Sequence, residues 1–386
     1  MIVLPGAESN FERLRGDEPI GFAPDACLIV RRPGSQCGVC RDACPTGVLS
    51  GGQWSITLET DGCVGCGLCA AACPTGALMV DGCTPHPVSA AGERIVLECR
   101  RVAPTDRDPN AVVVPCLGGL TVPDLLDFLE QTEASVIISD HGWCAQCPVG
   151  RCHSPWQPAI DEARAALAAV DGRLADELVV ERDELPVGTA MPVMAALRPD
   201  KQVGRRDFLR RMVGAVEPRD ASAESRRVVF GRGLVSPLKR KRVLERIGAL
   251  ATDLEQPMPA SLMPSVKITN GCELDGLCAA ICPTGALRRE EGDETLSLQF
   301  DAGRCITCGL CQTACASKAL SLWPKGDGTV PHGIVTLVSR HAVACPGCGD
   351  TFIPAGDERS CPYCEKTMNL MRELASLKLG SPAPSR

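Results

Sequence analysis

Cysteines at short, regular spacing are the residues of this chain most able to do chemistry. The complete pattern, Cys-x2-Cys-x2-Cys-x3-Cys-Pro, occupies residues 63–74, and variants of it occupy residues 37–45, 272–283 and 305–315. Four thiolates at this spacing surround a cubane iron–sulfur cluster, and the fourth cysteine of a run ligates the neighbouring cluster. Two runs make one two-cluster module, so the sequence predicts two such modules and four [4Fe–4S] clusters.

The crossover assigns a ligand set to each cluster of the first module. One set is complete and consists of Cys44, Cys63, Cys66 and Cys69. The other contains Cys37, Cys40 and Cys73 and lacks one ligand, since Gly34 stands where the first cysteine of the run belongs. We expect Cys27 to supply that ligand, with the chain returning through Pro33 and Gly34. The alternative is an unused, buried Cys27 beside a three-iron cluster.

The second module repeats this arrangement with one substitution. Its complete set consists of Cys282, Cys305, Cys308 and Cys311. In its other set, Asp275 replaces one cysteine and accompanies Cys272, Cys278 and Cys315. A carboxylate is a harder and weaker ligand for cluster iron than a thiolate. Either Asp275 binds one iron, or that corner is lost and a [3Fe–4S] cluster results.

A Cys-Pro-Thr-Gly turn begins at Cys44, Cys73 and Cys282, where proline ends a helix and glycine lets the chain reverse. The last run ends Cys315-Ala316-Ser317-Lys318 instead, so we expect that corner to be built differently. Taken together, the runs resemble the bacterial-type two-[4Fe–4S] ferredoxins in each module. That resemblance implies low-potential, one-electron transfer between closely spaced clusters.

The segment between the modules has a different pattern. Apolar runs at 95–99, 111–116 and 135–139 predict strands, and residues 122–131 and 159–170 predict helices, which indicates a small α/β unit with a mostly parallel sheet. Cys99 and Cys116 end two of the strands and Cys144 follows the third, so we expect these thiols at one sheet edge, where ligand sites form. With Cys147 and Cys152 the group holds five thiols, one more than a cluster needs.

The residues from 98 to 153 also resemble the small iron–sulfur (delta) subunit of methyl-viologen-reducing hydrogenases. The resemblance rests on Glu98-Cys99, Val114-Pro115-Cys116 and the dense string from Trp143 to His153. It implies a [2Fe–2S] cluster held by such cysteines and electron delivery to a heterodisulfide reductase.

Two cysteine pairs, twelve residues apart, lie near the end of the sequence. They are Cys345, Cys348, Cys361 and Cys364. This is zinc-ribbon spacing, in which four thiolates bind Zn²⁺ tetrahedrally in a closed, structural site. A rubredoxin-like mononuclear iron is the alternative.

These patterns predict a multidomain α+β protein. The expected parts are a ferredoxin-like 2[4Fe–4S] module at 1–92, the α/β iron–sulfur domain at 93–200, a basic helical connector at 201–263, a second ferredoxin-like module at 264–326 and a zinc-ribbon-like tail at 327–386. We expect one apolar face of the connector to contain Val243, Ile247, Leu250 and Leu254.

Composition indicates where such a chain works. It has 386 residues with 25 cysteines and 3% aromatic residues, so metal coordination supplies much of the folding free energy. An odd cysteine number and metal-type spacing favour a reducing compartment over a disulfide scaffold, and we expect a cytoplasmic protein. No apolar stretch reaches the length of a membrane span.

The connector carries a surplus of basic residues in a chain whose formal net charge is −7. Its Gly204-Arg205-Arg206-Asp207-Phe208-Leu209 string resembles a twin-arginine export motif but lies mid-chain without the apolar stretch that an export signal needs. A solvated connector is the plainer interpretation, and binding of a chaperone or an acidic partner is the other. The basic residues lack interleaved aromatics, which argues against nucleic-acid binding.

The favoured function is an iron–sulfur electron-transfer subunit of a larger cytoplasmic oxidoreductase complex. Its partners would be a flavoprotein, a hydrogenase or a molybdenum or tungsten enzyme, of the hydrogenase, formate dehydrogenase or heterodisulfide-reductase-like kind. The sequence contains no dinucleotide fingerprint, P-loop or nucleophilic triad, so we expect no catalytic residues of its own. The alternative function is an assembly or maturation factor that delivers clusters to a partner enzyme.

Overall fold

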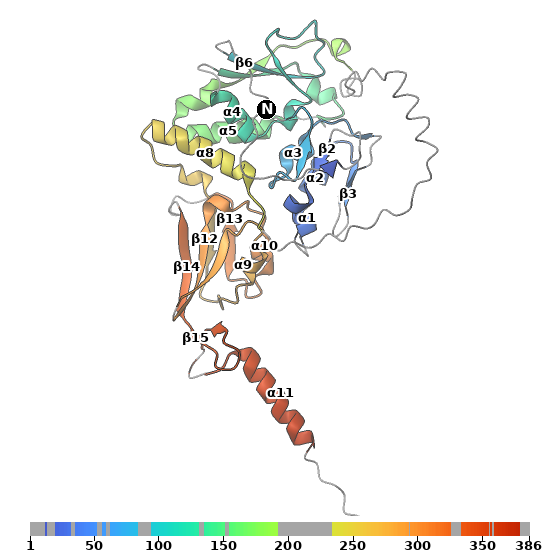
Figure 1. The fold of residues 1–386 in the computed structure, drawn as a ribbon. Helices are drawn as coiled ribbons and strands as arrows, with labels where there is room; N and C mark the ends of the chain where they lie inside the picture. The colour runs from blue at the N-terminus through green and yellow to red at the C-terminus, as the bar shows by residue number, and fades with distance from the viewer. Residues whose placement is uncertain are drawn as a thin grey trace, which may run out of the picture. The chain divides into compact units, whose positions relative to one another are not determined.

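The computed structural model describes residues 12–13, 20–31, 35–51, 56–58, 62–83, 94–130, 135–150, 154–191, 234–292, 294–325, 333–354, 356 and 359–378. The chain divides into two compact units, residues 1–259 and 260–386 (Figure 1). The described residues do not include Gly34, Cys152, His153 or the twin-arginine-like string at 204–209.

The first module is built from short antiparallel strands and two short helices. Strand β2 (Ile20–Phe22) pairs with β1 (Glu12–Arg13) and with β5 (Leu78–Val80), and β3 (Leu49–Gly51) forms a hairpin with β4 (Ile56–Leu58). Helices α2 (Val39–Asp42) and α3 (Leu68–Ala72) are short because a Cys-Pro pair follows each of them. A further turn of helix, α1 (Leu28–Arg31), is buried along most of its length.

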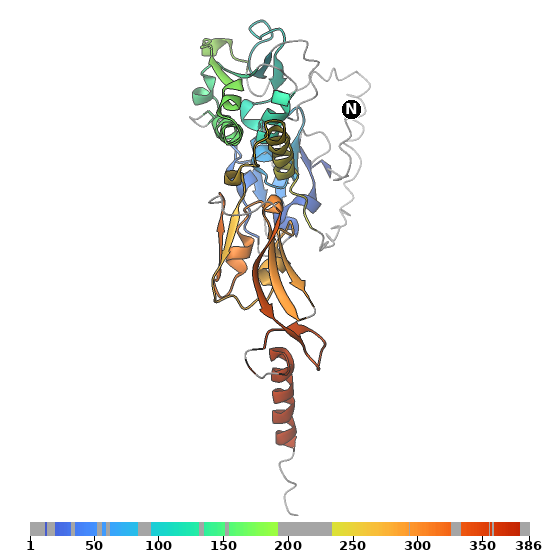
Figure 2. The ribbon, with the colours of Figure 1, turned by 90° about the vertical axis from the view of Figure 1, so that its left-hand side faces the viewer.

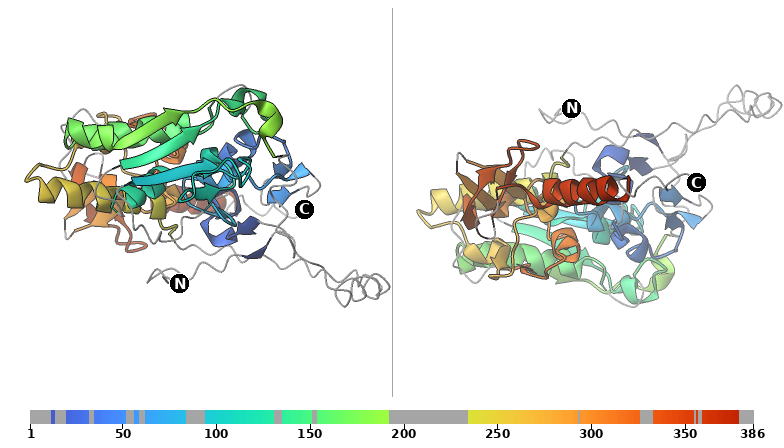
Figure 3. Two further views of the ribbon diagram at one scale, coloured as in Figure 1. Left: turned by 90° about the horizontal axis from the view of Figure 1, so that it is seen from above. Right: turned by 90° about the horizontal axis from the view of Figure 1, so that it is seen from below.

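A four-stranded parallel sheet follows, in the order β7-β6-β8-β9. Its strands are β6 (Arg94–Cys99), β7 (Val112–Val114), β8 (Ser135–Asp140) and β9 (Leu178–Arg182). Helices α4 (Val122–Glu130) and α5 (Gln157–Ala168) pack against each other beside the sheet (Figure 3, left). Phe128 and Leu97, both fully buried, belong to the core between these elements.

Helix α8 (Leu238–Asp253) completes the described part of the first unit and packs along α4 (Figure 1). Its contact is polar as well as apolar: Arg242 pairs with Asp124 at 3.2 Å, and Arg246 pairs with Asp127 at 2.8 Å. Ile247 is buried as predicted, but Leu254 is 38% exposed, because α8 ends one residue before it.

The second unit repeats the strand pattern of the first module. Strand β10 (Ser265–Ile268) pairs with β13 (Leu320–Trp323), and β11 (Leu287–Glu291) forms a hairpin with β12 (Thr295–Asp301). The two short helices are α9 (Leu277–Ile281) and α10 (Leu310–Ala314). Strand β14 (Ile334–His341) adds to the free side of β12, as Figure 2 shows, so this sheet continues past residue 326.

The end of the described chain is a small hairpin followed by a long helix. Strands β15 (Val343–Ala344) and β16 (Thr351–Phe352) pair antiparallel, and α11 runs from Pro362 to Lys378. Among the helices that the structure describes, none combines the length and apolar character that crossing a lipid bilayer requires.

Candidate iron-sulfur and metal centres

The complete predicted set of the first module, which we call site B, surrounds one hollow. Cys44, Cys63, Cys66 and Cys69 all line a space of about 310 Å³ together with apolar side chains of β2, β3 and β4. Burial, followed by the charges of Cys44 and Cys63, raises the pKa of Cys66 to about 11. Four thiols converging on an otherwise apolar hollow are the donor set that a cluster requires.

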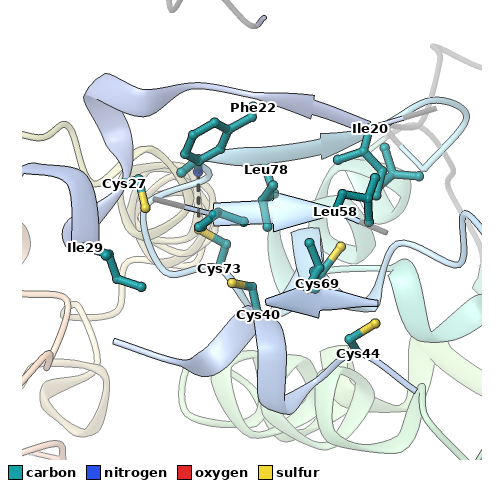
Figure 4. Close-up of a cluster of buried hydrophobic side chains, with 14 of the residues drawn as sticks. Ile20, Phe22, Cys27, Ile29, Cys40, Cys44, Leu58, Cys69, Cys73 and Leu78 are labelled. Carbon is teal, nitrogen blue, oxygen red and sulfur yellow. Dashed lines mark hydrogen bonds between the residues drawn. The ribbon is translucent and has the colours of Figure 1, made fainter. Parts of the chain in front are cut away.

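The second set of the first module, site A, includes Cys27. Burial, and then the charges of Cys73, Cys27 and Cys37, raise the pKa of Cys40 to about 11, which places all four thiols within electrostatic reach of one another. Figure 4 shows Cys27, Cys40 and Cys73 on one side of the buried core and Cys44 and Cys69 on the other. Cys27 lies near Cys37, Cys40 and Cys73, and its role as the fourth ligand stays a prediction.

The turn after each last cysteine has one recurring geometry. The thiol of Cys44, Cys73 or Cys282 lies 3.5–3.8 Å from the threonine hydroxyl two residues later. The expectation that the corner at Cys315 is built differently is wrong. Ser317 replaces the threonine at 3.6 Å, and Lys318 adopts the left-handed backbone (φ 54°) that Gly285 has elsewhere (φ 65°). This turn requires a hydroxyl two residues after the cysteine and a residue that can adopt positive φ one position later.

In the second module the complete set, site E, also lines one hollow. Cys282, Cys305, Cys308 and Cys311 face a space of about 330 Å³ with Phe300 and Leu287. Burial, and then the charges of Cys305, Cys308 and Cys282, raise the pKa of Cys311 to about 12. Site E thus matches site B in donor set, in lining and in position between its hairpin and helices.

The remaining set of the second module, site D, contains Asp275. Burial, and then the charges of Asp275, Cys272 and Cys315, raise the pKa of Cys278 to about 11, so the carboxylate lies within electrostatic reach of the thiols. The preceding Leu274 has φ 54°, nearly that of Thr307 (φ 53°) before Cys308. Asp275 therefore follows the same backbone conformation as Cys308 of site E.

Its hydrogen bond supports this equivalence. Asp275 Oδ1 accepts from the N–H of Leu277 at 3.1 Å, and Cys66 likewise interacts with the backbone N–H of Leu68, two residues later. Asp275 is exposed to solvent, however, whereas Cys66 is buried. Cys308, at the equivalent corner of site E, is exposed like Asp275, so this corner is open in both sites of the second module.

The α/β domain brings four of its predicted cysteines together, as site C. These are Cys99, Cys116, Cys144 and Cys147, at or after the carboxyl ends of β6, β7 and β8. Burial and then the charges of Asp140, Cys99 and Cys147 raise the pKa of Cys144 to about 12. The fifth predicted cysteine, Cys152, lies outside the described residues. Four thiols already suffice for one cluster.

A buried indole indicates that an acceptor belongs in site C. Trp156 is 1% exposed, and its N–H has no acceptor among the described residues, yet it lies close enough to Cys144 to oppose the rise in that thiol's pKa. A buried donor without a partner is costly. A thiolate or a cluster sulfur at this position would satisfy it, so the donor set and its surroundings fit an iron–sulfur group.

Two side chains near these sites, His141 and Cys83, have other contacts within the fold. His141 places Nδ1 2.8 Å from the carbonyl oxygen of Asp183 and Nε2 3.2 Å from Ser139 Oγ. Cys83, which the sequence assigns to no set, is buried against the backbone of Cys66, where a side chain on Gly67 would collide with its sulfur. Cys83 is a packing residue between the first module and the α/β domain.

Sites B and C are neighbours. Cys66 and Cys116 belong to one cluster of buried residues with Val64 and Val149, and the charge of Cys66 contributes to the raised pKa of Cys116 after burial and Cys99. Sequence alone did not indicate this contact, because β7 and the Cys66 loop are far apart in the chain.

The four tail cysteines form a compact group, site F. The sulfur atoms of Cys345, Cys348, Cys361 and Cys364 all lie within 4.8 Å of one another, between β15, β16 and the start of α11. The N–H of Cys361 donates to Cys345 Sγ at 3.3 Å, and this bond is the main reason that the pKa of Cys345 falls to about 6. A thiol already disposed to ionise suits a metal ion, which binds the thiolate.

Comparison with known proteins bears directly on the two modules. Two segments, residues 35–77 and 270–319, match the family described as a 4Fe-4S dicluster domain. The modules carry 4Fe–4S sites. These segments contain sites A and B in the first unit and sites D and E in the second, apart from Cys27.

Two curated proteins are similar to part of the chain. The polyferredoxin-like subunit of aliphatic sulfonate oxidoreductase from Pyrococcus furiosus is 32% identical over 89 residues, which is 22% of this chain and 50% of the relative. The thiosulfate reductase electron transfer subunit PhsB of Salmonella typhi is 34% identical over 84 residues, which is 22% of this chain and 35% of the relative. The chain thus spans half or less of the length of these relatives, both of which are named as subunits of oxidoreductases.

Proposed function

We propose that the chain is an iron–sulfur electron-transfer subunit of a larger cytoplasmic oxidoreductase complex, relaying single electrons between the redox centres of its partners. The observation that carries this proposal is the succession of sites A, B and C in one unit. Sites A and B are joined by α3, which contains Cys69 and ends one residue before Cys73, and sites B and C share the packing of Cys66 against Cys116.

An iron–sulfur cluster bound at each site would supply a one-electron donor and acceptor. The protein supplies the environment of each cluster. It buries or half-buries the thiols of sites A to C among apolar side chains, which limits water access, and backbone and hydroxyl groups form hydrogen bonds with sulfur. Burial and hydrogen bonding are the means by which a protein adjusts cluster potentials.

The finer assignments are also proposals. We assign a [2Fe–2S] cluster to site C, in line with the resemblance to hydrogenase delta subunits, and zinc to site F, where four thiols lie at tetrahedral-site spacing. The partners we propose are a flavoprotein, hydrogenase or molybdenum or tungsten enzyme of the hydrogenase, formate dehydrogenase or heterodisulfide-reductase-like kind. The names of the two relatives add sulfonate oxidoreductase and thiosulfate reductase to that range.

The test is a redox titration of the full chain, purified without oxygen together with the proteins that bind it. An electron-transfer subunit should show reversible EPR signals, and its clusters should be reduced by the bound partner with that partner's substrate. Clusters that are not reduced by the partner, or that do not cycle, would refute the proposal.

The carboxylate in site D favours one other function, cluster delivery, because a carboxylate binds cluster iron more weakly than a thiolate does. Mixing the loaded chain with an apoprotein acceptor separates the two functions. Transfer of iron to the acceptor at the rate at which its activity appears would favour delivery. Retention of iron through repeated redox cycles would favour electron transfer.

A further inference from the structure

Lys239, at the start of α8, contacts the helix that joins sites A and B. Its ammonium group donates to the carbonyl oxygens of Ala70 and Ala71, the latter at 2.8 Å. These carbonyls belong to α3, between Cys69 of site B and Cys73 of site A. A single positive charge from a distant part of the chain therefore lies at the junction of the two sites.

The position of this charge is fixed by the helix that bears it. Arg242, one turn after Lys239, pairs with Asp124 at 3.2 Å and also with Asp127, and Arg246 pairs with Asp127 at 2.8 Å. Ile247 and Ala251 are buried on the same helix. Because α8 is held against α4 at several points, the backbone that bears Lys239 is fixed, and two hydrogen bonds to α3 hold its ammonium group.

Cysteines of both cluster sites act electrostatically on Lys239. Burial lowers the pKa of Lys239, whereas the charges of Cys73, Asp124 and Cys69 favour its ammonium form. A half-buried charge is screened by salt less than an exposed one. The negative end of the α3 dipole also lies at these carbonyls, so the ammonium group offsets that field.

We propose that Lys239 supplies a fixed positive charge, which raises the reduction potentials of both clusters of the first module. Reduction adds one electron to a site, and a nearby fixed positive charge stabilises the more negative, reduced form. This inference rests on the proposed function, because it requires clusters at sites A and B. A helix cap alone would need the hydrogen bonds of Lys239 but not its charge.

The decisive variant is Lys239→Gln, which keeps a donor for the carbonyls but removes the charge. Lys239→Met is made in parallel so that the result does not depend on one variant's folding, and Lys239→Arg retains the charge. The matched control is Lys241→Gln on the same helix, since the Lys241 side chain is 65% exposed and pairs with Glu245. Each protein is purified without oxygen, its iron is counted, and its EPR signals are titrated against potential.

We expect Lys239→Gln and Lys239→Met to keep their iron and to lower the reduction equilibrium constants of two clusters about tenfold, which is about 59 mV for a one-electron couple. Lys239→Arg and Lys241→Gln should keep the potentials of the unmodified protein. Unchanged potentials in Lys239→Gln, or an equal fall in Lys241→Gln, would overturn the inference. Absence of cluster iron from the unmodified protein would instead refute the proposed function.

Discussion

Replacing Asp275 by cysteine tests the assignment of site D. The backbone around this position already matches that of Cys308, with φ values of 54° at Leu274 and 53° at Thr307. A thiol placed there should reach the cluster without rearrangement of the loop. Asp275→Cys is therefore expected to convert a three-iron or carboxylate-ligated signal into that of an ordinary cubane.

The expected change in the free energy of unfolding follows from the exposure of Asp275 and from its one hydrogen bond. Substitutions at exposed positions usually change the free energy of unfolding by no more than about 0.5 kcal/mol. Loss of the bond from the Leu277 N–H to Asp275 Oδ1 would cost about 1 kcal/mol, but a cysteine sulfur can accept the same bond, as at Cys66. We thus expect a change in stability below about 1 kcal/mol and a gain of about one iron per chain if site D holds three.

The assay is EPR and iron analysis of protein purified without oxygen. Glu273→Cys is the matched control, since Glu273 is an exposed acidic residue two positions away and outside the predicted set. It should leave both the spectrum and the iron count unchanged. An Asp275→Cys spectrum identical to that of the unmodified protein, with equal iron, would show that position 275 does not face the cluster.

Three further predictions concern the other sites. Cys27→Ser should remove a ligand of site A and so lower the iron count or yield a three-iron signal. Cys83 is a buried thiol outside every set, so Cys83→Ala should leave the iron count unchanged. Equal iron counts in both variants would contradict the assignment of Cys27. Trp156→Phe should lower the reduction potential of the site C cluster without changing the iron count, because it removes an N–H donor close to Cys144. Redox titration measures this potential, and an unchanged value would refute the role of the indole. A zinc chelator should release one zinc from site F and increase hydrogen exchange in β15 and β16 without loss of visible cluster absorption; equal exchange with and without zinc would contradict a structural metal there.

Sequence patterns located much of the fold that carries these sites. Strands β6 and β8 lie over the apolar runs at 95–99 and 135–139, because a buried parallel strand needs a continuous run of such residues. Strand β9 was not predicted, since its last residues are charged and exposed. Strand β14 was assigned to the tail, because pairing with β12 is not visible in the sequence of either strand.

For the ligand sets too, local patterns were informative and long-range contacts were not. The spacing of the runs and the crossover between them predict that four thiols share site B and four share site E, and each set lines one hollow. Contacts across long separations gave no such signal. Lys239 meets Ala71 from 168 residues away, and Cys66 and Cys116 share one cluster of buried residues although they belong to different parts of the chain. These contacts depend on packing between elements, which local residue patterns do not encode.

Metal and sulfide analysis with EPR, on protein purified without oxygen, tests the central claim most directly. The account predicts about 16 iron atoms or more per chain, nearly as much inorganic sulfide, and signals from several interacting clusters on reduction. An iron count near eight would remove one of the two modules. Thiols that are joined as disulfides, or that carry no iron in such material, would contradict the whole account.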